Sequence, residues 1–247
     1  MTYEITGRYA MVDGARCYYD VCGEGIPLVC IHMGWACSLQ WHHFMPLMAV
    51  AGFRVLAPDL PGHAKSMPVN WKPFRKMRDY AEWVWHFIEA TCGGEKPVVC
   101  GSGIGGDMTL QLACHHPEGI RAGMGFECAA RTGSISFLSG YADPHTFPGF
   151  SALTDNASTS AMYYPCDPLK VLESKWQHRA TYQETCVADW TPGTTTTCAN
   201  TCIASAARSS CTRARRTTTS RTRPCSTPSL RFRTGSPRAA SRQEWGI

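Results

Sequence analysis

One short stretch of this chain, KPVVCGSGIGGDMTLQLACHHPEG (residues 96–119), constrains the fold more than any other. A valine pair leads into three alternate glycines, Gly101, Gly103 and Gly105, and a helical pattern follows them. A strand that turns directly into a helix needs residues without side chains, because the two backbones meet at the turn. The stretch therefore predicts a β-strand, a sharp turn centred on Gly103, and a helix that extends to about His115.

The first 130 residues alternate between strand and helix patterns, which predicts an α/β fold with a mostly parallel sheet. Two apolar runs, 15–21 and 27–32, are split by the turn CGEGI, and we expect them to form an antiparallel pair. Further strands are expected at 52–60, 97–101 and 121–128, and a helix at 79–90.

Three stretches in this region carry a resemblance to a known family. They are LVCIHMGWACSLQWHHFMPLMAVAGFRVLAPDLPGHAKS, VVCGSGIGGDMTLQLACHHPEGIRA and GMGFEC, in that order along the chain. Together they resemble the oxyanion segment, the nucleophile elbow and the next strand of the α/β-hydrolase fold family. The resemblance implies a core at residues 1–130 with helices on both faces of the sheet, and a cap-like insertion at 131–189. It also implies a fold that is incomplete at its C-terminus.

The same resemblance assigns roles at the elbow, where relatives carry the pattern G-x-S-x-G and the serine is the nucleophile. Here Gly103 holds the nucleophile position, and the nearby serine, Ser102, lies one residue early, where its side chain would face away from catalytic partners. Backbone N–H groups of Ile104 and of Gly34 or Trp35 are implied as the oxyanion hole. The alternative reading is that the glycine turn serves packing alone, and the donors persist without catalysis.

An acid and a base complete the family's machinery. Glu127 closes the strand GMGFE and is the candidate acid, with helix capping or a salt bridge as the alternative role. The base histidine is expected after the last strand, but the final histidine of the chain is His178, within the insertion. The tail after it holds no histidine, and His32 and His63 belong to sequence motifs near the start of the chain. No histidine therefore stands at the place of the base.

The tail from residue 190 onward differs from everything before it. From Thr191 it holds ten arginines, no lysine and one acid, a charge of +9 that leaves −4 on the preceding residues against +5 overall. Threonine or serine fills twenty-one positions, too polar a composition to offset the entropy of ordering. We interpret the tail as disordered or read out of frame. A basic arm for nucleic acid is a weaker alternative, because the tail has only Phe232 and Trp245 for stacking. A zinc site at Cys198, Cys202, Cys211 and Cys225 is also weaker, because these cysteines lack paired C-x₂-C spacing.

Composition excludes several classes of function. No signal peptide or apolar run of membrane length occurs, so a reducing, cytoplasmic location is expected, with most of the fourteen cysteines as small buried side chains. No dinucleotide, phosphate-loop or metal-ligand pattern appears, and we expect no cofactor and no metal. The expected partner is a small apolar or aromatic carbonyl compound, with no nucleic acid and no membrane.

Three hypotheses about function stay open at this point. The lineage activity implied by the resemblance is hydrolysis of a small ester, lactone or related carbonyl compound, by a chain that here lacks the nucleophile and the histidine. The alternatives are a non-hydrolytic pocket protein, which binds a ligand or catalyses proton transfer or cyclisation, and an inactive truncated gene product.

Overall fold

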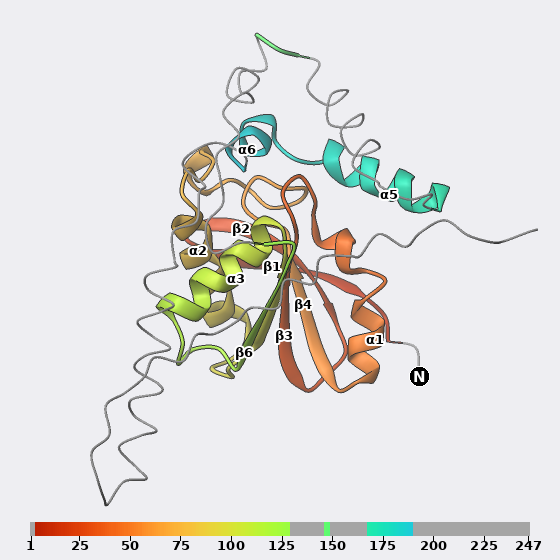
Figure 1. Cartoon of the computed structure of the whole chain (residues 1–247), viewed down its shortest axis with the longest axis vertical. Coiled ribbons are helices and arrows are strands. Elements are labelled where there is room, and N and C mark those ends of the chain that lie inside the picture. Colours follow the sequence, from red (N-terminus) through yellow and green to blue (C-terminus); the bar gives the residue numbers. More distant parts are fainter. Residues whose placement is uncertain (1–2, 129–145, 149–166, 190–247) are drawn as a thin grey trace, which may run out of the picture. The chain divides into compact units, whose positions relative to one another are not determined.

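The computed structural model describes residues 3–128, 146–148 and 167–189. Six strands form one sheet in the order β1-β2-β4-β3-β5-β6 (Figure 1). Pairs β1–β2 and β2–β4 are antiparallel, and β4–β3, β3–β5 and β5–β6 are parallel. The strands are β1 (Thr6–Val12), β2 (Ala15–Cys22), β3 (Ile26–Ile31), β4 (Phe53–Pro58), β5 (Val98–Ser102) and β6 (Ala122–Phe126).

Helices cover both faces of this sheet, as the sequence predicts. Along β3, Val29 and Ile31 face the core that contains α2 and α3, whereas Leu28 and Cys30 face the core that contains α1. This alternation is the two-residue period of a strand buried on both sides. The helices are η1 (Ser38–Trp41), α1 (Met45–Val50), η2 (Val69–Trp71), α2 (Met77–Thr91), α3 (Ile104–His115), α5 (Pro168–Arg179) and α6 (Gln183–Ala188).

The expected antiparallel pairing of the runs at 15–21 and 27–32 is wrong. Both runs are strands, β2 and β3, but β4 lies between them. The connecting loop crosses the start of β4: Gly25, at φ 106°, packs directly on the Gly52 carbonyl, and Ile26 N–H donates to the same oxygen at 3.3 Å. A glycine is needed there because a side chain would collide with the β4 backbone.

The expected helix at 79–90 is confirmed as α2, with Tyr80, Val84, Phe87 and Ile88 all buried. The insertion at 131–189 is described only in part, through α5, α6 and a short piece at 146–148. The tail interpretation, including the four cysteines of the alternative zinc site, lies outside the described residues.

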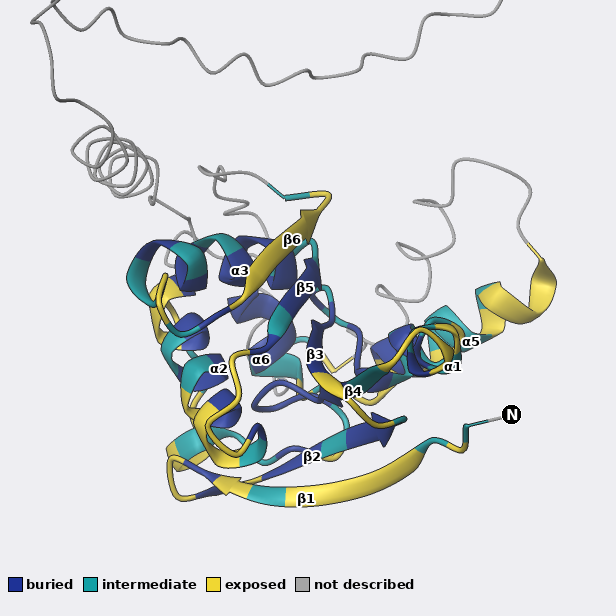
Figure 2. Cartoon of the chain, turned by 90° about the horizontal axis from the view of Figure 1, so that it is seen from below, coloured by how far each residue is buried: buried dark blue, intermediate teal, exposed yellow. Residues whose placement is uncertain are grey.

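Strand β6 forms an edge of the sheet and is exposed along its whole length (Figure 2). Its apolar side chains Met124 and Phe126 are 43% and 51% exposed. An exposed edge strand leaves a row of backbone donors and acceptors unpaired. The described part of the sheet therefore ends abruptly beside the elbow.

A buried carboxylate ties η1 to the sheet. Asp20 on β2 accepts hydrogen bonds from Tyr18 Oη at 2.6 Å and from His42 Nε2 at 2.7 Å. Burial alone raises the pKa of the Asp20 carboxyl, but hydrogen bonds from His42, Ser38 and Tyr18 outweigh it and lower the pKa from its ordinary 3.8. The ionised carboxylate thus holds the segment after β3 in place.

This shift gives a pH-dependent contribution to stability. Because the pKa of Asp20 is lower in the folded chain than in the unfolded chain, the contribution is present above 3.8 and is lost as the pH falls through the folded value. We expect Asp20→Asn to lower the free energy of unfolding near pH 7, and the loss to shrink as the pH falls below 3.8. Urea unfolding of both proteins across this range measures it, with exposed Asp79→Asn as the control. A loss that stays constant to the acid end would contradict the assignment.

Candidate active site

The turn between β5 and α3 has the backbone shape that the sequence predicts. Gly103 sits at φ 56° and ψ −122°, a strained conformation that residues with side chains rarely adopt, and serves as the N-cap of α3. Gly103 N–H donates to the Phe126 carbonyl at 3.0 Å, which ties the turn to the end of β6. The helix starts immediately at Ile104, so its first N–H groups point out of the turn without intrahelical partners.

The flanking glycines are there for steric reasons, as predicted. A side chain at Gly101 would strike the backbone of Gly105 and Gly106 at the start of α3. A side chain at Gly105 would strike the carbonyl of Ile31 and come within 2.6 Å of the carbonyl of His32, at the end of β3. The helix can therefore lie this close to both strands only because these two positions lack side chains.

Ser102 is the last residue of β5 and is paired in register with Phe126. Its hydroxyl makes no hydrogen bond with any residue that the structure describes, and no described histidine reaches it. Activation of a serine hydroxyl requires a base at about 2.6–3.2 Å. The arrangement around Ser102 in this structure thus gives it no partner for nucleophilic catalysis.

The loop after β3, residues 32–35, carries the second group of expected donors and is called the donor loop below. Gly34 in it is buried, and Trp35 adopts φ 66°, a left-handed conformation that costs energy in a residue with a side chain. Trp35 N–H donates to Asp189 Oδ2 at 3.3 Å, and its indole Nε1–H donates to the Cys186 carbonyl at 2.7 Å. One expected oxyanion donor is therefore already directed at a carboxylate of the chain itself.

Asp189 gathers several elements around one buried carboxylate. Besides Trp35, it accepts a hydrogen bond from Tyr80 Oη at 2.9 Å and contacts His63 Nε2 at 3.0 Å. The side chains of Asp189 and His63 are both fully buried. These residues, Asp189, His63, Tyr80 and Trp35, are called the Asp189 cluster; they join α6, the turn after β4, α2 and the donor loop.

Two histidines, His63 in the cluster and His32 beside it, are held by contacts of their ring nitrogens. His63 Nδ1 lies 3.3 Å from the Pro61 carbonyl, so both of its ring nitrogens face oxygen atoms. His32 contacts the His63 ring at 4.7 Å; its Nδ1–H donates to the Met33 carbonyl, and its Nε2 accepts from Leu60 N–H. Burial, followed by the repulsion of His63, lowers the pKa of His32 well below its usual value. Neutral His32 is thus a structural link between the donor loop and the turn after β4.

Sequence reasoning did not single out Asp189 or the burial of His63. One signal was present: Asp189 caps the C-terminus of α6, where a negative charge opposes the helix dipole. An acid in that place suggests a partner elsewhere in the fold.

Glu127, the candidate acid, follows β6 directly at the carboxyl edge of the sheet, with φ 50°. Its side chain is exposed and makes no ion pair or hydrogen bond with a described residue. Within residues 3–128, 146–148 and 167–189, no histidine lies in contact with it. Its role as an acid stays a prediction.

Among the described residues, no group of three or more histidine, cysteine or acidic side chains is placed to hold a metal ion. No described helix is long and apolar enough to cross a membrane.

Comparison with known proteins adds the family. Residues 26–127 match the model of the alpha/beta hydrolase fold family. This match supports the assignment of residues 26–127 to the α/β-hydrolase fold family.

A soluble epoxide hydrolase of Corynebacterium sp. strain C12 is 37% identical over 116 residues, which are 46% of this chain and 38% of that protein. The aligned residues thus make up less than half of this relative, and the same holds for the other curated relatives that the chain matches.

Solved structures extend the likeness of the α/β-hydrolase fold beyond the matched segment. The enol-lactonase from Burkholderia xenovorans LB400 superposes with a TM-score of 0.63 at 23% identity, covering 74% of this chain and 71% of that one. The bottromycin epimerase BotH, solved with bottromycin A2, gives 0.59 at 21% identity, covering 74% and 70%. At such identities the likeness concerns the fold alone.

The Asp189 cluster makes a prediction about stability. Asp189→Asn keeps the shape of the side chain but removes the charge opposite His63 and turns one acceptor into a donor. We expect a loss of about 1–3 kcal/mol in the free energy of unfolding, because a buried donor is left without its acceptor. Urea unfolding followed by circular dichroism measures it.

The matched control is Asp79→Asn in the first turn of α2, where the side chain is exposed. Its loss should stay below about 1 kcal/mol, the size of a surface helix-dipole term. Equal losses for the two variants would mean that Asp189 does not hold the cluster together.

Proposed function

We propose that this chain derives from hydrolases of small esters, lactones or related carbonyl compounds, and that it binds such a compound without forming a covalent intermediate. The observation that carries the proposal is the elbow itself: its backbone is built as in a nucleophile turn, while its apex, Gly103, ends at the α-carbon. A covalent acyl group needs a side-chain oxygen or sulfur at this point.

The remaining groups suit a carbonyl oxygen. The N–H of Ile104 opens a helix of twelve residues, and the partial positive charge of that helix end favours a polarised oxygen. Trp35 N–H lies on the donor loop, and its present acceptor is Asp189. Polarisation of a bound carbonyl is useful to binding, proton transfer or cyclisation, none of which requires a nucleophile at the apex.

Relatives support both parts of the proposal, the descent from hydrolases and a present role without hydrolysis. The matched proteins include epoxide hydrolases and a 2-hydroxymuconate semialdehyde hydrolase, which indicates a hydrolytic lineage. The epimerase with the same fold shows that chemistry other than hydrolysis is compatible with such a scaffold. Preserved donors without a nucleophile favour the non-hydrolytic reading for this chain.

Restoring the serine tests whether a base is present. We expect Gly103→Ser to raise kcat/KM for p-nitrophenyl acetate by less than about tenfold, because a positioned base alone is worth about 10²–10⁴-fold. Gly103→Ala is the matched control: both variants place a Cβ 3.2 Å from Met33 Cβ at the same positive φ, but only serine adds a hydroxyl. A gain of a hundredfold or more for serine over alanine would mean that a base serves the apex.

Ligand binding tests the donors directly. Acetophenone carries a carbonyl oxygen and an apolar ring, whereas ethylbenzene has a similar shape and no oxygen. We expect acetophenone to shift the amide resonance of Ile104 in a saturable way, and ethylbenzene to leave it in place, because only the former accepts a hydrogen bond. Titrations of ¹⁵N-labelled protein followed by NMR measure both. Equal shifts with the two compounds, or none with either, would contradict the proposal.

A further inference from the structure

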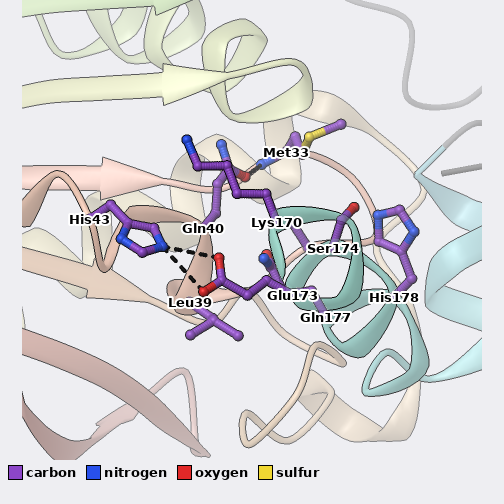
Figure 3. A pocket seen from close by; sticks show the side chains of 10 residues that line it. Met33, Leu39, Gln40, His43, Lys170, Glu173, Ser174, Gln177 and His178 are labelled. Atoms are coloured by element: carbon purple, nitrogen blue, oxygen red, sulfur yellow. Dashed lines mark hydrogen bonds and ion pairs between the residues drawn. The ribbon is translucent and has the colours of Figure 1, made fainter. Parts of the chain in front are cut away.

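A groove of about 260 Å³ lies between α5 and the segment that follows the donor loop (Figure 3). One wall comes from residues 33–43 and the other from residues 170–178. The volume is slightly below the range of pockets that hold drug-sized molecules, so it suits a ligand of about ten non-hydrogen atoms.

The one acidic side chain among the lining residues, Glu173, already has a hydrogen-bond partner. Both of its carboxylate oxygens lie close to His43 Nε2, at 3.0 and 3.2 Å, as the dashed lines of Figure 3 mark. Glu173 is therefore held within the groove, where its charge opposes an anionic ligand.

Three other lining residues, Lys170, Gln40 and Ser174, present hydrogen-bond donors. Lys170 on α5 makes no ion pair, and its ammonium no hydrogen bond, with any described residue. Gln40 Oε1 accepts from Met33 N–H at 2.9 Å, which fixes the amide so that its two N–H donors face the other way. The hydroxyl of Ser174, one turn along α5 from Lys170, is likewise without a described partner. An ammonium, an amide and a hydroxyl thus line one small groove.

Apolar side chains complete the lining on the opposite wall. Met33, Ala36 and Leu39 contribute them, and Met33 also packs against the apex of the elbow, 3.2 Å from the position of a Cβ on Gly103. A ligand that satisfies both walls needs an anionic end with several acceptor sites and a small apolar body.

We propose that this groove binds a small organic carboxylate, with the carboxyl group at Lys170 and Gln40 and the apolar body against Met33, Ala36 and Leu39. A carboxylate offers two oxygens and about four acceptor sites, which match the donors of the ammonium and the amide. The inference goes beyond the proposed function, because the ligand needs no carbonyl at the elbow.

Benzoate and benzamide form the test pair, since they share size and shape and differ in charge. We expect isothermal titration to show saturable benzoate binding that weakens several-fold between about 0.05 M and about 0.5 M salt, and benzamide to bind at least tenfold more weakly. Lys170→Gln should weaken benzoate about tenfold, the effect of one charge-assisted hydrogen bond. Lys175→Gln, on the same helix but outside the lining, should leave the affinity unchanged.

Two more variants make the outcome decisive. Glu173→Gln removes the one acidic lining group and should tighten benzoate binding about two- to fivefold. Lys170→Gln should leave the acetophenone-induced shift of the Ile104 amide unchanged, so failure at the elbow and failure in the groove are distinguishable. Equal affinity for benzoate and benzamide, an equal effect of the two lysine variants, or no saturable binding of benzoate would each overturn the proposal.

Discussion

The close approach of three backbones at the elbow is the constraint on which the rest of the site depends. Strand β5 runs into α3 across Gly103, and α3 lies against the end of β3 because Gly101 and Gly105 have no side chains. This contact aims the first N–H groups of α3 at the carboxyl edge of the sheet, beside the donor loop. In parallel α/β sheets, ligands bind at that edge.

A second interaction, the Asp189 cluster, fixes the donor loop from the other side. Trp35 holds a strained left-handed conformation while Asp189 and the Cys186 carbonyl take both of its N–H groups. Residues late in the described chain thus set the geometry of a loop near its beginning. A site of this kind depends on α6 as much as on the core strands.

Much of this was predictable from the sequence, and the exceptions have physical causes. The glycine spacing at 101–105 requires a specific backbone contact, so it identified β5, the turn and α3. The pairing of β2 with β3 was wrong because strand order is a long-range property; a local turn such as CGEGI does not reveal that β4 lies between. Strand β1 was missed although Asp13 and Gly14, both at positive φ, mark a tight hairpin between β1 and β2. The Asp189 cluster joins residues more than a hundred positions apart, and only the folded chain brings them together.

The central claim is that the apex of the elbow carries no nucleophile, so the bound carbonyl compound stays noncovalent. The most direct measurement is the intact mass of the full chain after incubation with a fluorophosphonate, which phosphonylates activated serines. The account predicts an unchanged mass. A stoichiometric adduct, mapped to Ser102 or to any other serine, would contradict it.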